Sequence, residues 1–468
     1  MPQFLPLVSS GLLHPKKRDS AYARQIVYLN YGLVALGARL RDSGFDVTIY
    51  HGGYHDPLAR ARDIGSRLDD DGLLLLSLPS FYSIPWAIRF CEAIMALCPR
   101  AQVIAGGRWV VDRNQRWLHR HLPTVKRFVP GIADDSIDRV VARALETRPL
   151  KDTKSPFPPL LDYSLLDECK EFTPSVEQSR GCGRGCAFCS EKGQSLQTAS
   201  PVSVADNLVA LTNVYGDHSN CYMEASRFEP DQAWVDAFCR AYSDRECMVR
   251  WRCEVRMDGL SAASLDALSK HGLAVLDCGL ESASSTQLIR MQKTHDVRTY
   301  LSRARELLRV SYDCGVWAKI NVMLYPGETH DTIAETFDWL DSVRQYVKGI
   351  SAYPLVVYGP NATGASFLKS VTEFGAMPLD DGLMGKGFVQ LHLSKEIDAP
   401  SSIAEANAIS RAFMSSEDYW DLKSFNYFRK SYTKGKFLED LEHIDVGELP
   451  FKHPPRPYQP DIAMDSPI

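Results

Sequence analysis

A short glycine-rich stretch near the middle of the chain constrains its fold and chemistry more than any other feature. Cys182, Cys186 and Cys189 stand in a C-x3-C-x2-C spacing within residues 179–193. With 12 cysteines in 468 residues, chance would give roughly 0.008 such matches, so the spacing requires an explanation. Thiolates are the usual ligands of iron–sulfur clusters, which normally take four. Three ligands in one loop would leave one iron of a cubane cluster open to a small molecule.

Two other interpretations of the same cysteines remain, a structural zinc site and three buried thiols. A structural zinc site needs a fourth ligand, usually from another C-x2-C or H-x3-H pair. No histidine lies between Lys154 and His218, and no second C-x2-C pair occurs in the sequence. Gly181, Gly183 and Gly185 let the backbone wrap tightly around a bound group. The cluster is therefore the favoured interpretation.

The loop resembles the signature of radical S-adenosylmethionine (radical SAM) enzymes, including the aromatic Phe188 before the last cysteine. This resemblance implies a [4Fe–4S] cluster with Cys182, Cys186 and Cys189 as its metal ligands and catalytic residues, and Phe188 beside the cofactor. It further implies that the amino and carboxylate groups of SAM bind the open iron. One-electron reduction would then cleave SAM to methionine and a 5′-deoxyadenosyl radical, with a flavodoxin- or ferredoxin-type electron donor.

Composition narrows the class of protein. A chain of 468 residues should form two or three domains. Its net charge of −5 gives no footprint for nucleic acid, although a mild excess of acid would suit a cationic substrate. The N-terminus lacks a basic segment before its apolar residues, and the most apolar run, residues 72–86, is broken by prolines. We therefore expect a cytoplasmic enzyme with reduced cysteines that acts on a small molecule, without a membrane partner.

Residues 1–148 alternate strand-like and helix-like segments. Strands are expected at residues 4–9, 46–50, 72–78 and 102–105, and helices at residues 31–43 and 85–97. The continuous apolar run at 72–78 is typical of a buried parallel strand. This order predicts an α/β, doubly wound Rossmann-like domain that binds ligands at the carboxyl ends of its strands.

Residues 32–47 and 103–109 of this domain resemble the cobalamin-binding domain that precedes many radical SAM methyltransferases. The resemblance implies cobalamin, held by its edges against glycine-rich backbone. The D-x-H-x-x-G motif that supplies a cobalt ligand in other cobalamin proteins is absent from the sequence. Two alternatives therefore stay open, a cobalamin-binding domain and a vestigial Rossmann-like scaffold that only supports the second domain.

Prolines at positions 149, 156, 158 and 159 mark a linker over residues 149–170. From 171 to 395 the chain alternates again, with strands expected near residues 174–178, 220–224, 249–255, 274–279, 317–324 and 349–357. Helices are expected at residues 231–242, 261–271, 297–312 and 332–343. Six strand–helix units match the partial (β/α)6 TIM-like barrel of radical SAM enzymes. Residues 396–468 should form a small, mostly helical C-terminal cap over the barrel, with an extended tail.

Several strand ends carry polar residues that resemble family contacts to SAM. The period of two places Glu254 and Arg256 on one face of the third strand. The stretch D-C-G-L-E-S resembles the family's fourth-strand motif, and S-A-Y-P-L could line the adenine. Family members often carry D-D-x-F after the second strand. This chain lacks that motif, and Glu224 is the acidic residue that could take its role. The predicted cofactor-binding residues outside the loop are Glu224, Glu254, Arg256, Glu281, Ser282 and Tyr353.

The irregularly spaced cysteines of the barrel are expected to be buried apolar thiols, because auxiliary clusters need grouped thiolates. Cys253 and Cys278 are expected near strand ends that face the site, where one could quench a radical.

The leading functional hypothesis is a cobalamin-dependent radical SAM methyltransferase of natural-product or antibiotic biosynthesis. The alternative is a cobalamin-free radical SAM dehydratase or epimerase acting on an amino sugar or aminoglycoside. A non-catalytic iron–sulfur carrier or sensor is disfavoured, because a carrier gains nothing from a full barrel with an open iron.

Overall fold

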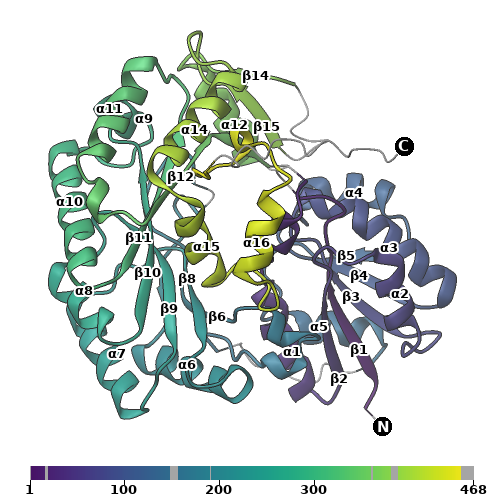
Figure 1. The fold of residues 1–468 in the computed structure, drawn as a ribbon. Helices are drawn as coiled ribbons and strands as arrows, with labels where there is room; N and C mark the ends of the chain where they lie inside the picture. Colours follow the sequence, from purple (N-terminus) through teal and green to yellow (C-terminus); the bar gives the residue numbers. More distant parts are fainter. Residues whose placement is uncertain are drawn as a thin grey trace, which may run out of the picture.

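Two parallel sheets, one in each half of the chain, organise the structure (Figure 1). The computed structural model describes residues 2–15, 19–147, 156–189, 191–359, 362–380 and 388–454. Both sheets are covered by helices, so the predicted α/β class is confirmed.

The N-terminal sheet has the strand order β2-β1-β3-β4-β5, with every neighbouring pair parallel. Its strands are β1 (Phe4–Ser9), β2 (Asp46–His51), β3 (Leu73–Ser77), β4 (Gln102–Gly106) and β5 (Val125–Phe128). Its helices are α1 (Tyr31–Asp42), α2 (Pro57–Gly65), α3 (Ile84–Leu97), α4 (Gln115–His121) and α5 (Ile137–Ala144). The sequence pattern had not indicated α2, α4, β5 or α5.

The leucines of β3 explain the unbroken apolar run there. Leu73 and Leu75 pack into the core that includes α1 and α5, whereas Leu74 and Leu76 pack into the core of α2 and α3. Both faces of the strand are therefore buried, as in a doubly wound sheet. The Rossmann-like prediction for this half is confirmed.

The second sheet has the order β12-β11-β10-β9-β8-β6-β7, and six of its strands are parallel. They are β6 (Ser175–Arg180), β8 (Asn220–Ala225), β9 (Arg250–Arg256), β10 (Leu273–Glu281), β11 (Trp317–Leu324) and β12 (Gly349–Pro354), while β7 (Gln197–Thr198) is antiparallel. The helices are α6 (Pro201–Tyr215), α7 (Gln232–Asp244), α8 (Ala262–Ser269), α9 (Ser285–Arg290), α10 (Val297–Asp313) and α11 (His330–Asp341). This is the predicted partial (β/α)6 barrel.

Side chains alternate between the inside of the barrel and the helix layer. On β9, Arg252 and Glu254 face inward, whereas Cys253 between them is fully buried in the apolar core. Cys278 on β10 is likewise fully buried, beside the inward-facing Asp277. The expectation that these two cysteines face the site was therefore wrong, because one position along a strand reverses the face.

The predicted sixth strand, residues 349–357, is divided between two sheets. Pro354 ends β12, since it has no N–H to donate, and Leu355 N bonds Leu324 O. The chain then enters a three-stranded sheet of β13 (Val356–Tyr358), β15 (Phe388–His392) and β14 (Met377–Pro378), with α12 (Ala362–Thr372) beside it.

The C-terminal region is helical, as predicted, with α14 (Ala399–Phe413), α15 (Ser416–Ser424) and α16 (Lys434–Leu441). Helices α15 and α16 lie between the barrel and the N-terminal sheet (Figure 1). Phe425 receives a hydrogen bond on its carbonyl from Asn220 at the start of β8, and its ring lies 5.6 Å from the Arg250 guanidinium. The cap therefore closes the amino ends of the strands. The predicted tail lies outside the described residues beyond 454.

The described part of the predicted linker packs against both sheets. Tyr163 is buried and its hydroxyl donates to Ser175 O at 2.6 Å, while Asp167 pairs with Arg60 of α2 at 2.7 Å. Residues 148–155, where the linker begins, lie outside the described residues. Throughout the described ranges, no helix combines the length and apolar character that crossing a bilayer requires.

Candidate active site

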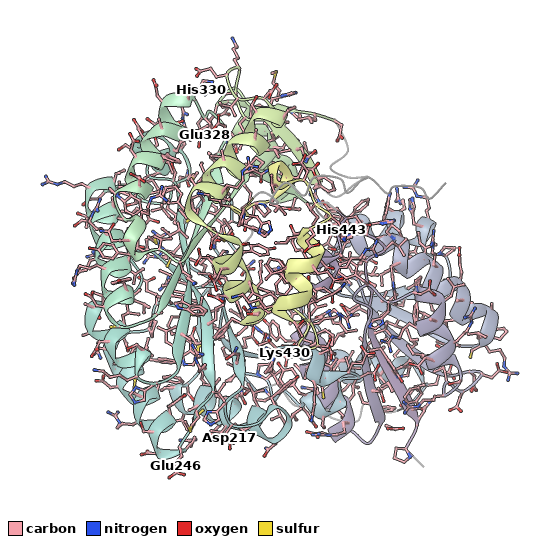
Figure 2. The ribbon with its side chains drawn as sticks, viewed as in Figure 1. Asp217, Glu246, Glu328, His330, Lys430 and His443 are labelled. Carbon is pink, nitrogen blue, oxygen red and sulfur yellow. The ribbon has the colours of Figure 1, made fainter. Side chains whose placement is uncertain are left out.

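The predicted site residues gather towards the carboxyl ends of the barrel strands. Figure 2 shows Glu328 and His330, which follow β11, at one end of the barrel, and Asp217 and Glu246, which precede β8 and β9, at the other. Active sites of such barrels lie at the carboxyl end. The three-cysteine loop leaves β6 at this end.

Backbone contacts fold the cysteine loop tightly on itself. Gly181 has φ of 69°, and a Cβ there would lie 2.1 Å from Ser195 O, so only glycine fits. The N–H groups of Cys182 and Gly183 both donate to Gln194 O, at 3.2 and 2.8 Å. The loop therefore has a defined shape before any group binds.

The three thiols share one environment. Burial raises the pKa of Cys189, and the nearby Cys182 and Cys186 sulfurs raise it further. Among the described residues, no three His, Cys, Asp or Glu side chains are placed to hold a single metal ion. Ligands of a cluster bind different irons and stand further apart than ligands of one ion. A donor set of three neighbouring thiols on a preformed loop fits a cluster, which deprotonates the thiols it binds.

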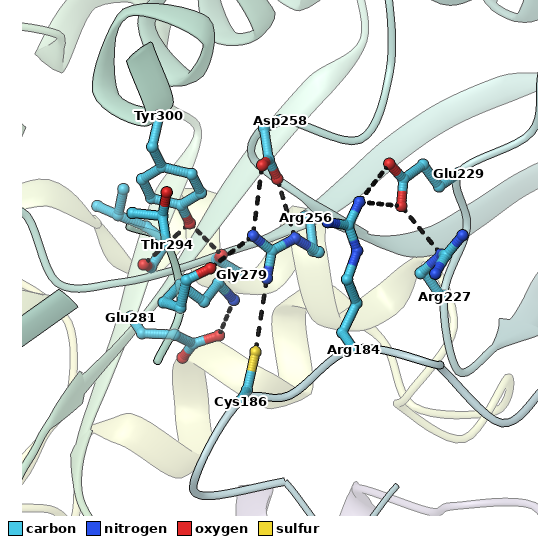
Figure 3. Close-up of polar contacts among 12 residues, drawn as sticks. Arg184, Cys186, Arg227, Glu229, Arg256, Asp258, Gly279, Glu281, Thr294 and Tyr300 are labelled. Atoms are coloured by element: carbon cyan, nitrogen blue, oxygen red, sulfur yellow. Dashed lines mark hydrogen bonds and ion pairs between the residues drawn. The ribbon is translucent and has the colours of Figure 1, made fainter. Parts of the chain in front are cut away.

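Arg256, at the end of β9, points into the cysteine loop (Figure 3). Its Nη1 donates to Cys186 Sγ at 3.5 Å. Its Nε and Nη2 donate to the two oxygens of Asp258 at 2.9 and 3.3 Å, and Nη2 also donates to Lys293 O at 2.8 Å. Burial tends to raise the pKa of Asp258, but hydrogen bonds from Arg256 outweigh it and hold that pKa below its usual range.

Glu281 lies at a β-bulge at the end of β10 and has φ of 68°. Lys293 Nζ bonds Glu281 Oε1 at 3.0 Å and lies 5.8 Å from the ring centre of Phe188, which is partly buried against the core. The structure therefore supplies the donor that a carboxylate at this strand end requires. Glu281 and Phe188 are brought together through a lysine that sequence reasoning had not singled out.

Ser282 is turned away from the cysteine loop. It is buried, its Oγ shares a hydrogen bond with Thr336 Oγ1 of α11 at 3.0 Å, and it accepts from Ser284 N. Glu328, which follows β11, accepts from Tyr325 N at 3.2 Å and from the Thr332 hydroxyl. Both side chains are engaged by the protein around them.

Glu224 and Glu254 face the interior of the barrel on neighbouring strands. Burial raises the pKa of Glu224 to about 7, with Glu254 and Glu177 adding to the effect against a hydrogen bond from Ser175. Burial and Asp277 also raise the pKa of Glu254. Yet Glu254 is solvent-accessible, so it borders open space that protein surrounds. The two carboxyls lie beneath the cysteine loop, not on it.

The open space extends to the N-terminal sheet. Tyr28, which follows β1, is 60% exposed although burial raises its pKa to about 12, with the nearby Tyr353 of β12 contributing. Tyr353 itself is 39% exposed. Arg108, which follows β4, lies 3.6 Å from Glu191 of the cysteine loop and acts on the pKa of Glu224. The carboxyl edge of the first sheet therefore faces the interior of the second.

Two buried nitrogens at this edge have no hydrogen-bond partner. They are Trp109 Nε1, after β4, and His51 Nδ1, at the end of β2. Burial lowers the pKa of His51 to about 4, and its Nε2 lies 2.9 Å from Tyr28 O. The Trp109 indole N–H lacks an acceptor, whereas His51 Nδ1 lacks a donor, because the neutral ring uses its Nε2–H on Tyr28 O. A cofactor rich in amides would supply both, so the edge fits a cofactor held by its rim.

Sequence reasoning missed several residues at the site. Arg108 lies within residues 103–109, which had been singled out, and Asp258 continues the two-residue period of Glu254 and Arg256, so both could have been indicated. Arg227, whose Nη1 donates to Cys182 O at 2.8 Å, comes two positions after the end of β8. Lys293 and Tyr28 lie in loops without a recognisable pattern, and no signal pointed to them.

Residues 176–340 match the sequence profile of the Radical SAM superfamily, described as Radical_SAM. A radical SAM domain is a fold that binds a [4Fe–4S] cluster and SAM. No curated protein matches the chain in sequence.

Solved structures resemble the whole arrangement of sheets. The radical S-adenosylmethionine methyltransferase TsrM from Kitasatospora setae, with cobalamin and a [4Fe–4S] cluster bound, gives a TM-score of 0.66 at 15% identity, covering 90% of each chain. The cobalamin-dependent S-adenosylmethionine radical enzyme OxsB, with aqua-cobalamin and SAM bound, gives 0.63 at 14% identity. That match covers 87% of this chain and 66% of OxsB. At such identities the likeness shows the fold.

Proposed function

We propose, from the radical SAM domain at residues 176–340, that this chain is a cobalamin-dependent radical SAM enzyme that C-methylates a small natural-product molecule. The observation that carries the proposal is the convergence of three thiols with the Arg256 guanidinium at the carboxyl end of the barrel. The proposal divides the chain into a cobalamin-binding-type domain (residues 1–148), a linker (149–170), a radical SAM barrel (171–395) and a C-terminal cap with its tail (396–468).

Cys182, Cys186 and Cys189 would hold the cluster at the carboxyl end of the barrel. The bound cluster would supply the one-electron reduction that cleaves SAM, and the resulting 5′-deoxyadenosyl radical would take a hydrogen from the substrate. Lys293 orients Glu281 next to Phe188, where a carboxylate can accept from SAM hydroxyl or amino groups. Ser282 remains a weaker candidate, because its hydroxyl already bonds Thr336.

The carboxyl edge of the N-terminal sheet would hold cobalamin, which supplies the methyl group when bound. Gly107 has φ of 99°, and a Cβ there would lie 2.6 Å from Ser77 Oγ, so the turn after β4 packs closely against the end of β3. Trp109, whose Nε1 has no partner, follows that turn directly, and the exposed Tyr28 lies at the same edge of the sheet. Arg108 of the same turn lies 3.6 Å from Glu191, so this edge lies beside the cysteine loop.

The alternative function is a cobalamin-free dehydratase or epimerase of an amino sugar or aminoglycoside. The observation that favours an amine-bearing substrate is the pair Glu224 and Glu254 at the border of the barrel interior. Burying these carboxyls is costly without a cationic or donor partner. An amine could satisfy them in either reaction, so they bear on the substrate and not on the type of reaction.

The test is an anaerobic assay of the reconstituted protein with SAM, cobalamin, a low-potential reductant and candidate amine substrates. Methyl transfer should give 5′-deoxyadenosine and S-adenosylhomocysteine together, and the protein should retain the visible bands of the corrin. Production of 5′-deoxyadenosine alone, with no retained corrin, would support the dehydratase or epimerase. Absence of SAM cleavage from protein that holds its cluster would contradict both.

A further inference from the structure

The hydrogen-bonding groups of Arg256 are divided between two tasks. A guanidinium has five N–H donors in a planar fork. Nε and Nη2 are taken by Asp258 and Lys293 O, and the ring of Tyr300 lies 5.8 Å from Cζ. The fork is therefore fixed, and its remaining terminal nitrogen, Nη1, is aimed at Cys186 Sγ. Figure 3 shows this arrangement.

We propose that Arg256 sets the reduction potential of the cluster by donating a charge-assisted hydrogen bond to the thiolate of Cys186. The inference rests on the proposed function, because it requires the cluster. It gives Arg256 a role as a positioning and tuning residue, distinct from the SAM contact that the sequence predicted.

The physical reason is the charge that reduction adds. One electron from a low-potential donor makes the cluster and its thiolates more negative by one charge, and no bond of the chain forms or breaks. Hydrogen bonds to sulfur and nearby positive charge stabilise that state and raise the potential. The Arg256 side chain is only 11% exposed, so water screens the interaction little.

Because Asp258 neutralises much of the charge of Arg256, the hydrogen bond to Cys186 should affect the reduction potential more than the net charge does. The Asp258 carboxylate pairs with Arg256 at 2.9 Å and offsets the positive charge at a distance. The directed N–H···S contact is not offset in this way. A lysine at position 256 would keep the charge but lose the fork, so it should recover only part of the effect.

The experiment is a potentiometric titration of the full-length, reconstituted protein without SAM, followed by EPR of the reduced cluster. For Arg256→Met we expect the ratio of reduced to oxidised cluster at a fixed potential to fall about tenfold, equal to about 59 mV for one electron. Arg256→Lys should lie between this variant and the wild type. The matched control is Arg184→Met, because Arg184 stands in the same loop but binds Glu229 at 2.6 Å. It should shift the ratio less.

An unchanged ratio in Arg256→Met with full iron and sulfide content would overturn the inference. Weaker SAM binding with an unchanged ratio would also overturn it and would assign Arg256 to SAM. If Arg256→Met does not assemble a cluster, Arg256→Lys carries the test by the same criterion. Failure of the wild type to assemble a cluster would instead count against the proposed function.

Discussion

Two arginines on the inner face of β9 show how the two ends of the barrel differ. We call the amino ends of the strands, covered by the C-terminal helices, the floor, and the carboxyl ends, beside the cysteine loop, the mouth. Arg252, near the amino end, makes two 2.6 Å hydrogen bonds to Asp277 and donates to Leu422 O and Asn426 of the C-terminal region. Arg256, four positions along, contacts Cys186. The floor satisfies its charges within the protein, whereas at the mouth Arg256, although paired with Asp258, also directs one N–H at a thiol of the cysteine loop.

This difference separates stabilising charge from functional charge. Burial tends to raise the pKa of Asp277, but Arg252 and Lys319 outweigh it and hold the pKa well below its usual range. Glu254, the register partner of Asp277 on the neighbouring strand, and Glu224 have raised pKa values and border open space. Perturbed carboxyls next to open space are typical of functional sites, whereas a fully paired buried ion pair is typical of structure.

The largest effect is expected from removing the buried ion pair between Arg252 and Asp277. Arg252→Met leaves Asp277 with Lys319 at 3.3 Å and removes the bonds to the cap. We expect the free energy of unfolding to fall by roughly 3–5 kcal/mol, the usual cost of removing one partner of a buried pair. Urea unfolding of the wild type and the variant measures it.

A second variant completes that comparison. The double change Arg252→Met with Asp277→Leu should recover only part of the loss, because it removes the carboxylate that Arg252 had paired but leaves the buried Lys319 ammonium with its bond to Asn321 Oδ1 at 2.7 Å. A cost below about 1 kcal/mol for Arg252→Met alone would show that the floor is not held by this pair.

A smaller effect is expected for the pH dependence of stability that Glu224 contributes. The pKa of Glu224 is raised to about 7, so the folded state holds its proton more firmly than the unfolded state. Stability from this group is present at low pH and is lost as pH rises through about 7. Between about pH 6 and pH 8 the wild type should lose on the order of 1 kcal/mol that Glu224→Gln does not lose.

The measurement is the free energy of unfolding by urea at both pH values. Glu335→Gln, on the exposed side of α11, is the matched control for removal of a carboxylate. If the free energy of unfolding changes equally between the two pH values in the wild type and in Glu224→Gln, Glu224 is not buried in the way described.

The smallest effect concerns the contact between the two sheets. Arg108 has a side chain that is 82% exposed and lies 3.6 Å from Glu191. Arg108→Ala should change the free energy of unfolding by less than about 1 kcal/mol, as exposed ion pairs do. A calorimetric melt that split into two transitions would show instead that this contact joins the sheets.

The sequence allowed much of the fold and part of the site to be predicted. Strands and helices followed from periods of two and 3.6, and the thiols from their spacing. Cys253 and Cys278 were misplaced because an error of one position reverses the face of a strand. The closure of the barrel floor by Phe425 joins residues 205 positions apart, and Arg256 reaches Cys186 across 70 positions. No local pattern contains such contacts.

The most direct test is the EPR spectrum and iron content of the anaerobically reconstituted protein after reduction. The wild type should hold about four irons per chain and give the signal of a reduced [4Fe–4S] cluster. Cys186→Ala should lose both, whereas Cys278→Ala, a buried cysteine outside the loop, should keep them. A wild type without a cluster, or Cys186→Ala with an unchanged signal and iron content, would contradict the account.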